Sequence, residues 1–243
     1  MFYFLNKQFW TQPWLVALFI SSLTVVIFGR YLLTSLLYRY ILNRISHSLR
    51  NSLTKHFHQI KGEIKWAFFS SLVFAILGTL CLLAFQHDLT AIYTRITDYS
   101  LLYFFMSPLL ILSLYETYYY WLHRWMHTPT VFRIVHRVHH DSLKPTVFTA
   151  FSFHPVEAFL QFLFFPLALL FIPMHLSMVA LVFTVLTFCA VVNHSGFEIY
   201  ATRLRRHLIG SAHHDLHHQE FRTNFGLNFT WWDKVMKTES NKF

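Results

Sequence analysis

Histidine stands out in this chain by both number and spacing. The 243 residues include 17 histidines, and eight of these form three rows with intervals of three or four residues. The rows are His123 and His127 in HRWMH, His136, His139 and His140 in HRVHH, and His214, His217 and His218 in HHDLHH. Because an α-helix turns about 100° per residue, these intervals bring side chains onto one helical face. The sequence therefore predicts three segments that each present a row of imidazoles.

Imidazoles at this density indicate metal binding. A single buried histidine is more often a hydrogen-bonded core residue, and one pair spaced by four residues is weak evidence on its own. Several protonated imidazoles packed together would repel one another, whereas neutral imidazoles bind iron, zinc, copper and nickel. His154 in SFHPVE and His194 in VVNHSGFE stand in unusual settings and raise the count to ten. One ion binds about four to six ligands, so ten histidines predict two ions.

The remainder of the chain indicates a membrane protein. Of its residues 55% are hydrophobic and 13% are charged, whereas charged residues make up about 25% of a soluble domain. Apolar runs at 13–29, 66–86 and 101–121 each approach the ~20 residues that cross a bilayer as a helix. The first run is not followed by a signal-peptide cleavage pattern, so we interpret it as an uncleaved span.

A fourth apolar region, residues 156–192, differs from the other three. It contains Pro166 and Pro173, and proline interrupts helices. This region therefore predicts a hairpin of two shorter helices. The expected fold is all-α, an integral membrane helical bundle with about three spanning helices plus a helical hairpin, and with a cytoplasmic histidine-rich cap.

Basic residues are unevenly shared between the loops, and this asymmetry predicts orientation. Between the second and third apolar runs only Arg95 is basic, and cytoplasmic loops carry the excess of lysine and arginine. The first loop and every histidine row should therefore face the cytoplasm. The stretch 41–65 is compatible with an interfacial amphipathic helix and with a solvated loop. The basic residues between the first two runs are Arg30, Arg39, Arg44, Arg50, Lys55, Lys61 and Lys65.

Taken together, the motifs resemble those of a known family. HRWMH, HRVHH, FHPVE, NHSGFE and HHDLHH, followed by NFGLNFTWWD, are similar in order and spacing to the fatty acid hydroxylase / sterol desaturase superfamily of membrane di-iron enzymes. The resemblance covers about 101–238. After WWD the family tends to show a Gly-Thr pair, whereas here Lys237 precedes Thr238. The resemblance implies a single membrane domain over 1–243. Residues 1–100 would hold N-terminal spans and a basic loop, and residues 101–238 would form the catalytic region.

The resemblance also implies the site and its chemistry. Two iron ions, which zinc can replace, would use O₂ as co-substrate to hydroxylate or desaturate a sterol-like, sphingoid or fatty acyl lipid. Asp141, Glu157, Asn193 and Asp215 adjoin ligands, where they could orient imidazoles or act as caps and surface groups. Glu116 is unusual at its depth and could face the site. The implied ligands are His123, His127, His136, His139, His140, His154, His194, His214, His217 and His218.

Partners and alternatives follow from what the chain lacks. No cytochrome, flavin or ferredoxin motif occurs, so a separate electron donor, cytochrome b5-like or ferredoxin-like, is expected. No nucleic-acid motif is present. A histidine-rich metal transporter and a non-catalytic lipid-binding relative are the alternatives, and a transporter would need ionisable residues along a path through the membrane. The expected location is the bacterial inner membrane or the endoplasmic reticulum, with the catalytic face cytoplasmic.

Overall fold

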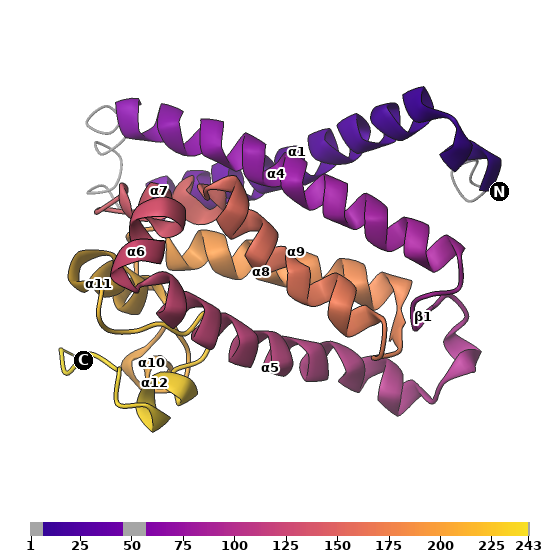
Figure 1. Ribbon diagram of the computed structural model, residues 1–243. Coiled ribbons are helices and arrows are strands. Elements are labelled where there is room, and N and C mark those ends of the chain that lie inside the picture. Colours follow the sequence, from indigo (N-terminus) through magenta and orange to yellow (C-terminus); the bar gives the residue numbers. More distant parts are fainter. Residues whose placement is uncertain (1–6, 46–56, 243) are drawn as a thin grey trace.

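Four long apolar helices form the body of the protein. The computed structural model describes residues 7–45 and 57–242. Each long helix could cross a membrane by its length and composition, and large apolar side chains stay exposed along them, such as Val25 at 69% and Leu102 at 74%. This surface suits lipid contact, and the bundle confirms the expected membrane fold (Figure 1). The four helices are α1 (Pro13–Ile45), α4 (Phe57–Gln86), α5 (Leu101–Met126) and α9 (Leu176–Asn193).

Helices α1 and α4 extend further than the apolar runs that predicted them. Residues 41–45 end α1 and residues 57–65 begin α4, so these parts of the stretch 41–65 continue the long helices. A separate interfacial helix there is therefore ruled out for 41–45 and 57–65, and residues 46–56 lie outside the described part of the chain. The helices continue because basic side chains at these positions can reach the polar boundary of a membrane while their stems stay apolar.

The fourth apolar region forms the expected hairpin. Helix α8 (Pro155–Leu169) runs away from the histidine end and α9 returns to it. Pro166 lies inside α8 and does not end it, and the turn falls at residues 170–173. In the turn, β2 (Met174–His175) pairs in parallel with β1 (Ile92–Tyr93), which connects α4 to α5. The hairpin therefore reaches the far end of the bundle.

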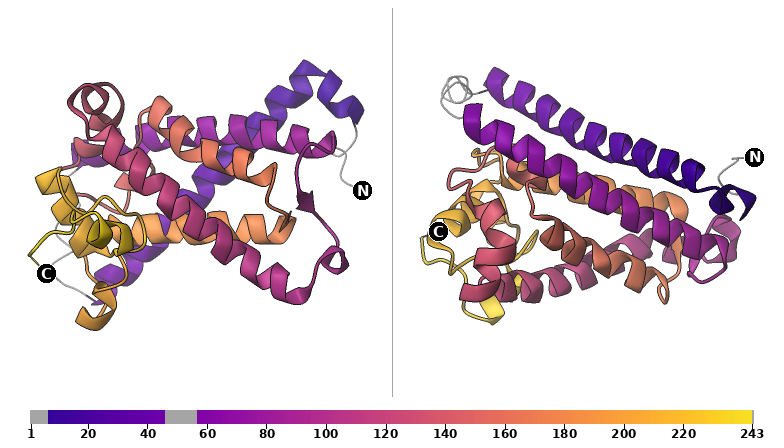
Figure 2. Two further views of the ribbon diagram at one scale, coloured as in Figure 1. Left: turned by 60° about the horizontal axis from the view of Figure 1, so that its bottom comes forward. Right: turned by 45° about the horizontal axis from the view of Figure 1, so that its top comes forward.

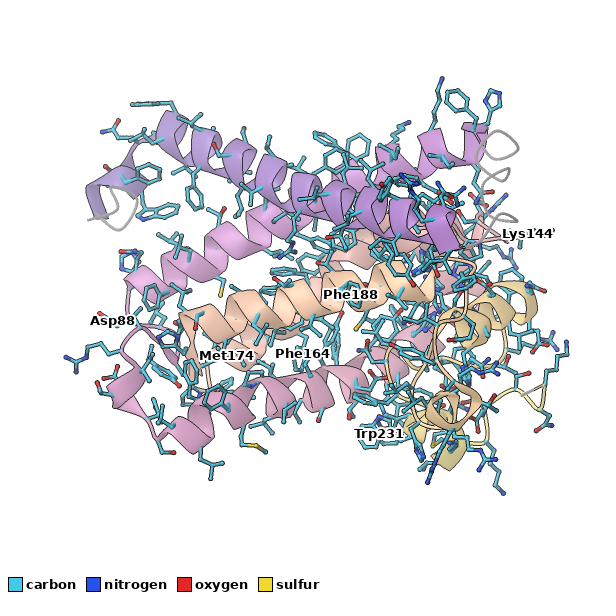
Figure 3. All side chains as sticks on the ribbon, turned by 180° about the vertical axis from the view of Figure 1, so that it is seen from behind. Asp88, Lys144, Phe164, Met174, Phe188 and Trp231 are labelled. Atoms are coloured by element: carbon cyan, nitrogen blue, oxygen red, sulfur yellow. The ribbon has the colours of Figure 1, made fainter. Side chains whose placement is uncertain are left out.

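A cap of short elements covers the histidine end. Figure 2 shows these elements gathered where α1 and α5 end and where α4 and α8 begin. Figure 3 shows nitrogen and oxygen atoms concentrated at this end, near Lys144 and Trp231, with mostly carbon around Phe164 and Phe188 in the bundle. The elements are α6 (Pro129–Val131), the π-helix η4 (Phe132–His136), α7 (Arg137–His140), η5 (Thr149–Phe151), α10 (Thr202–Arg205), α11 (Ser211–Glu220) and α12 (Trp231–Val235).

The two N-terminal helices hold the segment that follows HRVHH. Tyr31 on α1 donates its hydroxyl to the backbone oxygen of Phe148 at 2.7 Å. On α4, the carboxylate of Glu63 is 2% exposed and accepts hydrogen bonds from the hydroxyls of Ser142, Thr146 and Thr149 at 2.6–2.7 Å. A buried carboxylate is costly unless hydrogen bonds replace its water, and here three hydroxyls do so. The N-terminal helices thus position the cap.

Candidate metal centre

Nine of the ten histidines singled out from the sequence meet in two groups. Within each group the ligand atoms lie within 4.8 Å of one another. Both groups draw on several segments, and both include residues of HRVHH and HHDLHH, so the two groups adjoin: the rings of His140 and His218, one from each group, are 4.5 Å apart. The groups are His123, His127, His136, His140 and His217, and His139, His194, His214 and His218.

The Nε2 atoms of these rings face one another at short range. In the first group, Nε2 of His136 lies 3.1 Å from Nε2 of His123 and 3.1 Å from that of His140. In the second, Nε2 of His194 lies 2.8 Å from that of His214 and 3.2 Å from that of His139. Two nitrogens bound at right angles to one ion, each at about 2.1 Å, would lie roughly 3.0 Å apart. The spacing therefore fits ligands that share an ion.

The outer ring nitrogens fix the tautomer that ligation needs. Nδ1 of His136 donates to the buried carboxylate of Glu157 at 2.8 Å. Nδ1 donates to a backbone oxygen in His123, His139, His194 and His217, at 2.7–3.3 Å. A neutral imidazole carries one proton, so with Nδ1 protonated each Nε2 offers a lone pair. Lone pairs that face one another cannot form hydrogen bonds, and a shared cation would turn their repulsion into attraction.

Burial also keeps these imidazoles neutral. Desolvation, reinforced by neighbouring histidines, holds the pKa of His136, His139 and His140 well below the usual range. Burial lowers the pKa of His194 and of His217 to about 4. A metal ligand must be deprotonated, so the site presents its histidines in the binding form at neutral pH.

Local backbone features bring the rows to their groups. The π-helix η4 ends at His136 and lies directly before α7, which carries His139 and His140; single π turns occur often at functional sites because they rotate the residues that follow. Helix α11 is followed by Phe221, whose φ of 61° is left-handed. This conformation is strained for a residue with a side chain, and the Phe221 ring lies 4.9 Å from that of His140, in a tilted arrangement.

Two buried carboxylates hold the loop that follows α11. Glu116 on α5, fully buried, accepts backbone N–H groups of residues 227–229 at 2.8–3.3 Å. Asp233 on α12 accepts the N–H groups of Phe225 and Gly226, both at 2.8 Å. The loop supplies the backbone oxygens that accept hydrogen bonds from Nδ1 of His123 and His217. By holding the loop, the two carboxylates help to orient these two members of the five-histidine group.

The departure from the Gly-Thr pair has a structural explanation. Thr238 donates its hydroxyl to Asp233 at 2.7 Å, so the threonine of the pair keeps a role in holding the loop. Lys237 has a φ of 57°, a left-handed conformation that glycine adopts without strain. The family's glycine suits this conformation, and lysine adopts it here at a cost of about 1–2 kcal/mol.

Four other residues singled out from the sequence do not contact the two groups. His154 caps α8, accepting the N–H of Val156, and its ring lies 6.1 Å from that of Trp66. Asp141 is exposed, 3.7 Å from Arg137. Each of these side chains therefore has its partner outside the two groups.

Of the remaining two candidates, Asn193 is buried and Asp215 is half-buried. Asn193 donates to the backbone oxygen of Leu227 at 2.7 Å, which joins α9 to the loop held by Glu116. Asp215 lies on the outer side of α11, and burial raises the pKa of its carboxyl to about 7. Of the four side chains expected to orient ligands, only Glu157 therefore bonds directly to a grouped histidine among the described residues.

Sequence reasoning missed several positioning residues. Glu198 in NHSGFE accepts the N–H of Ala212 at 3.0 Å and so caps α11; a side chain at Gly210 would collide with it at 2.6 Å. Glu63 and Asp233 were also missed. Glu116 was expected to face the site, whereas its carboxylate accepts N–H groups of the loop at residues 227–229. Two of these acidic residues could have been recognised from the sequence, because Glu116 lies inside an apolar run and Glu63 lies beside one. An acidic residue in such a place needs a partner.

The comparison with known proteins agrees with this geometry. A family model described as fatty acid hydroxylase matches residues 108–238, which contain every grouped histidine and the loop.

The chain belongs to the fatty acid hydroxylase family.

Among its relatives in this fatty acid hydroxylase family are sterol enzymes. The Delta(7)-sterol 5(6)-desaturase ERG3B of Gibberella zeae is 31% identical over 72% of this chain and 54% of its own length. The C-4 methylsterol oxidase erg25 of Schizosaccharomyces pombe is 35% identical over 54% of this chain and 46% of its own length. The lathosterol oxidase of Mus musculus is 28% identical over 93% of this chain and 77% of its own length.

The chain spans about half the length of the first two relatives. No solved structure matches it. The relatives are named as sterol desaturases and oxidases, and the family model is described as fatty acid hydroxylase.

Proposed function

We propose that the two histidine groups hold two iron ions and that the protein hydroxylates or desaturates a membrane lipid with O₂. The observation that carries the proposal is the pair of groups whose Nε2 atoms converge, while Nδ1 of five of the nine rings donates to an oxygen outside the groups. Five- and four-histidine sets without cysteine suit iron, and zinc is the expected replacement. When bound, two ferrous ions would supply the reductive activation of dioxygen that cleavage of an unactivated C–H bond requires.

The protein's own residues would orient the ligands, exclude water and admit an apolar chain. The two ligand groups are buried, and beneath them lies an apolar cluster that includes Ile111, Tyr115 and Phe165. The ring of Tyr119, in the same cluster, lies 5.1 Å from that of His123. We propose that the substrate enters this region from the membrane. The sterol enzymes among the relatives favour a sterol-like lipid over sphingoid and fatty acyl chains.

We place the histidine cap on the cytoplasmic side of a bacterial inner membrane or endoplasmic reticulum, where a separate electron donor reaches it. The basic loop between the first two spans supports this orientation. Nine histidines are the proposed ligands. We leave out His154, the tenth ligand expected from the sequence, because its side chain caps α8.

One observation weighs against the transporter alternative. In the four described spans, every Asp, Glu, Lys and Arg lies in the half nearer the histidine end. Glu63 and Glu116, the two acidic ones, are fully engaged with hydroxyl and backbone donors. Ion transport would need ionisable side chains towards the β1–β2 end as well.

The test is metal content together with lipid product. Protein loaded with ferrous iron should hold about two ions per chain. Cells that express it should accumulate a lipid changed by one oxygen or by one double bond, and cells that express His139→Ala should not. Labelling with ¹⁸O₂ separates the two reactions, because only a hydroxylated product retains the label. A single ion per chain, or lipid profiles identical in the two strains, would contradict the proposal.

A further inference from the structure

We infer that the surface pocket beside His127 is the docking site of an acidic one-electron carrier protein. The inference rests on the oxidoreductase function proposed above and names the partner's place on the cap. The pocket has a volume of about 240 Å³. Its lining is His127, Pro129, Phe132, Arg133, Phe221 and Arg222.

The first argument is access to the histidine groups. Eight of the nine grouped histidines are buried, and His127 alone is partly exposed. Its Nε2 lies 3.1 Å from that of His217, which is fully buried. The ring of His127, a proposed ligand, therefore lines the pocket directly. Since electron transfer slows steeply with distance, a carrier seated here would have the shortest route to the first group.

The second argument is charge. Arg133 and Arg222 are exposed at the pocket, and neither forms an ion pair within residues 7–45 and 57–242. No acidic residue lines the pocket. In the cap segments 121–145 and 201–243, eleven lysines and arginines face five acidic residues. A partner with an acidic surface would meet an attractive potential here, which speeds encounter.

The third argument is shape. Phe132, Phe221 and Pro129 provide a small apolar surface in a pocket that both arginines also line, and the two phenyl rings lie 5.5 Å apart. An apolar centre with a charged rim is the composition of transient interfaces, which bury little area and dissociate quickly. Such a contact suits a carrier that must leave after giving one electron. The elements that carry it, α6 and the end of α11, lie in the cap beyond the ends of α8 and α9 (Figures 1 and 2).

The electron balance requires two such visits per turnover. Hydroxylation converts R–H, O₂, two electrons and two protons to R–OH and water. Desaturation consumes the same O₂, electrons and protons, removes two hydrogens from the lipid and forms two waters. In either case two reduced carriers become oxidised, one electron each, so the carrier must bind, release and be replaced within one catalytic cycle.

The experiment compares two double charge reversals of equal net change. Arg133→Glu with Arg222→Glu alters the pocket, whereas Arg203→Glu with Arg206→Glu alters exposed arginines elsewhere on the cap. Both variants and the parent protein are loaded with iron in zwitterionic nanodiscs. The soluble domain of cytochrome b5 and a ferredoxin are first tested with the parent protein. The carrier that the parent protein oxidises faster is then used as the probe. Carrier binding and carrier oxidation are followed across ionic strength, with metal content and melting temperature as measures of integrity.

The expected result is a loss confined to the pocket variant. Its carrier oxidation should fall on the order of 10-fold at low salt and should lose most of its salt dependence. Metal content and melting temperature should match those of the parent protein. The control variant should keep most of the parent rate.

Two results would overturn the inference. One is equal carrier binding and oxidation in the two variants. The other is a pocket variant that keeps the carrier and instead loses binding to vesicles containing phosphatidylserine, which would make the pocket a lipid headgroup site. Failure of the proposed function is distinct, since the parent protein itself would then hold no redox-active metal.

Discussion

Nδ1 of His123 donates a hydrogen bond to the backbone oxygen of Phe225, 2.8 Å away and 102 residues later in the chain. The same loop receives Nδ1 of His217 on the oxygen of Thr223 at 2.7 Å. Two members of the five-histidine group therefore take their orientation from one loop. The loop itself is fixed by carboxylates that touch no grouped histidine, so its integrity and that of the metal centre are linked.

Replacing Asp233 by asparagine should loosen this loop. The amide group can accept only one of the two backbone N–H groups and would leave the other unpaired in a buried site. An unsatisfied buried donor costs about 1–3 kcal/mol. We expect a lower melting temperature and, in a chelator titration, earlier loss of the ion from the five-histidine group. Asp98→Asn, an exposed change at the other end of the bundle, is the matched control. Simultaneous loss of both ions would contradict the assignment of the loop to one group.

Replacing Gly226 by alanine should disturb the same loop by crowding. An added Cβ would lie 2.6 Å from the side chain of Ile209 and from the backbone oxygen of Phe229. Overpacking of this kind typically costs 1–3 kcal/mol. Gly29→Ala is the control, because nothing lies within 4 Å of its added carbon and alanine favours a helix. Thermal unfolding of both variants checks the prediction, which fails if their melting temperatures fall equally.

Removing one ligand from each group should have separable effects on metal content. His139 belongs to the four-histidine group and His217 to the five-histidine group. Loss of a side chain that merely supports a ligand weakens metal sites about 10–100-fold, so loss of a ligand should cost at least that. We expect His139→Ala and His217→Ala each to lose one ion and all turnover. His87→Ala, exposed at the far end of α4, should keep both ions. If His139→Ala kept its full metal content, the proposal that the four-histidine group binds an ion through His139 would be contradicted.

His154→Ala should retain both ions. The side chain caps α8 and lies near Trp66, away from both groups. Loss of a cap costs about 0.5–2 kcal/mol, so stability should fall while metal content and turnover persist. Metal analysis and lipid product in the same preparation test this. Loss of an ion would show that His154 joins the ligands when metal is bound.

Much of the fold was predictable because its signals are local. The lengths of the apolar runs predicted the spans, and Pro166 and Pro173 predicted the hairpin. Pro166 lies within α8 and does not end it. Histidine spacing indicated eight of the nine residues that the structure groups, and the setting of His194 indicated the ninth. Glu63 and Asp233 could not be found in this way, because their partners are backbone atoms and hydroxyls of segments distant in sequence. Hydrogen bonds between segments that meet only through tertiary packing produce no regular spacing of residues in the sequence.

The topology makes a prediction of its own. Lys144 lies at the histidine end (Figure 3), as does α10, which carries Arg203, whereas Asp98 lies in the connection between β1 and α5 at the opposite end (Figure 1). After replacement of Cys81 and Cys189, single cysteines at 144 and 203 should react from the cytoplasmic side, and a cysteine at 98 only from the other side. Labelling with an impermeant maleimide before and after lysis decides this. Reaction of 144 and 203 from opposite sides would show that the hairpin does not return.

The order in which the chain is synthesised has a consequence for the two histidine groups. Both groups draw members from α11, near the C-terminal end of the chain, and from HRVHH, some eighty residues earlier. Until α11 emerges from the ribosome and docks, the earlier imidazoles have no complete set of neighbours. Metal loading must therefore be one of the last events of biogenesis, after the spans are already inserted. A cell that runs short of metal would therefore accumulate a protein that is already inserted and holds no ion.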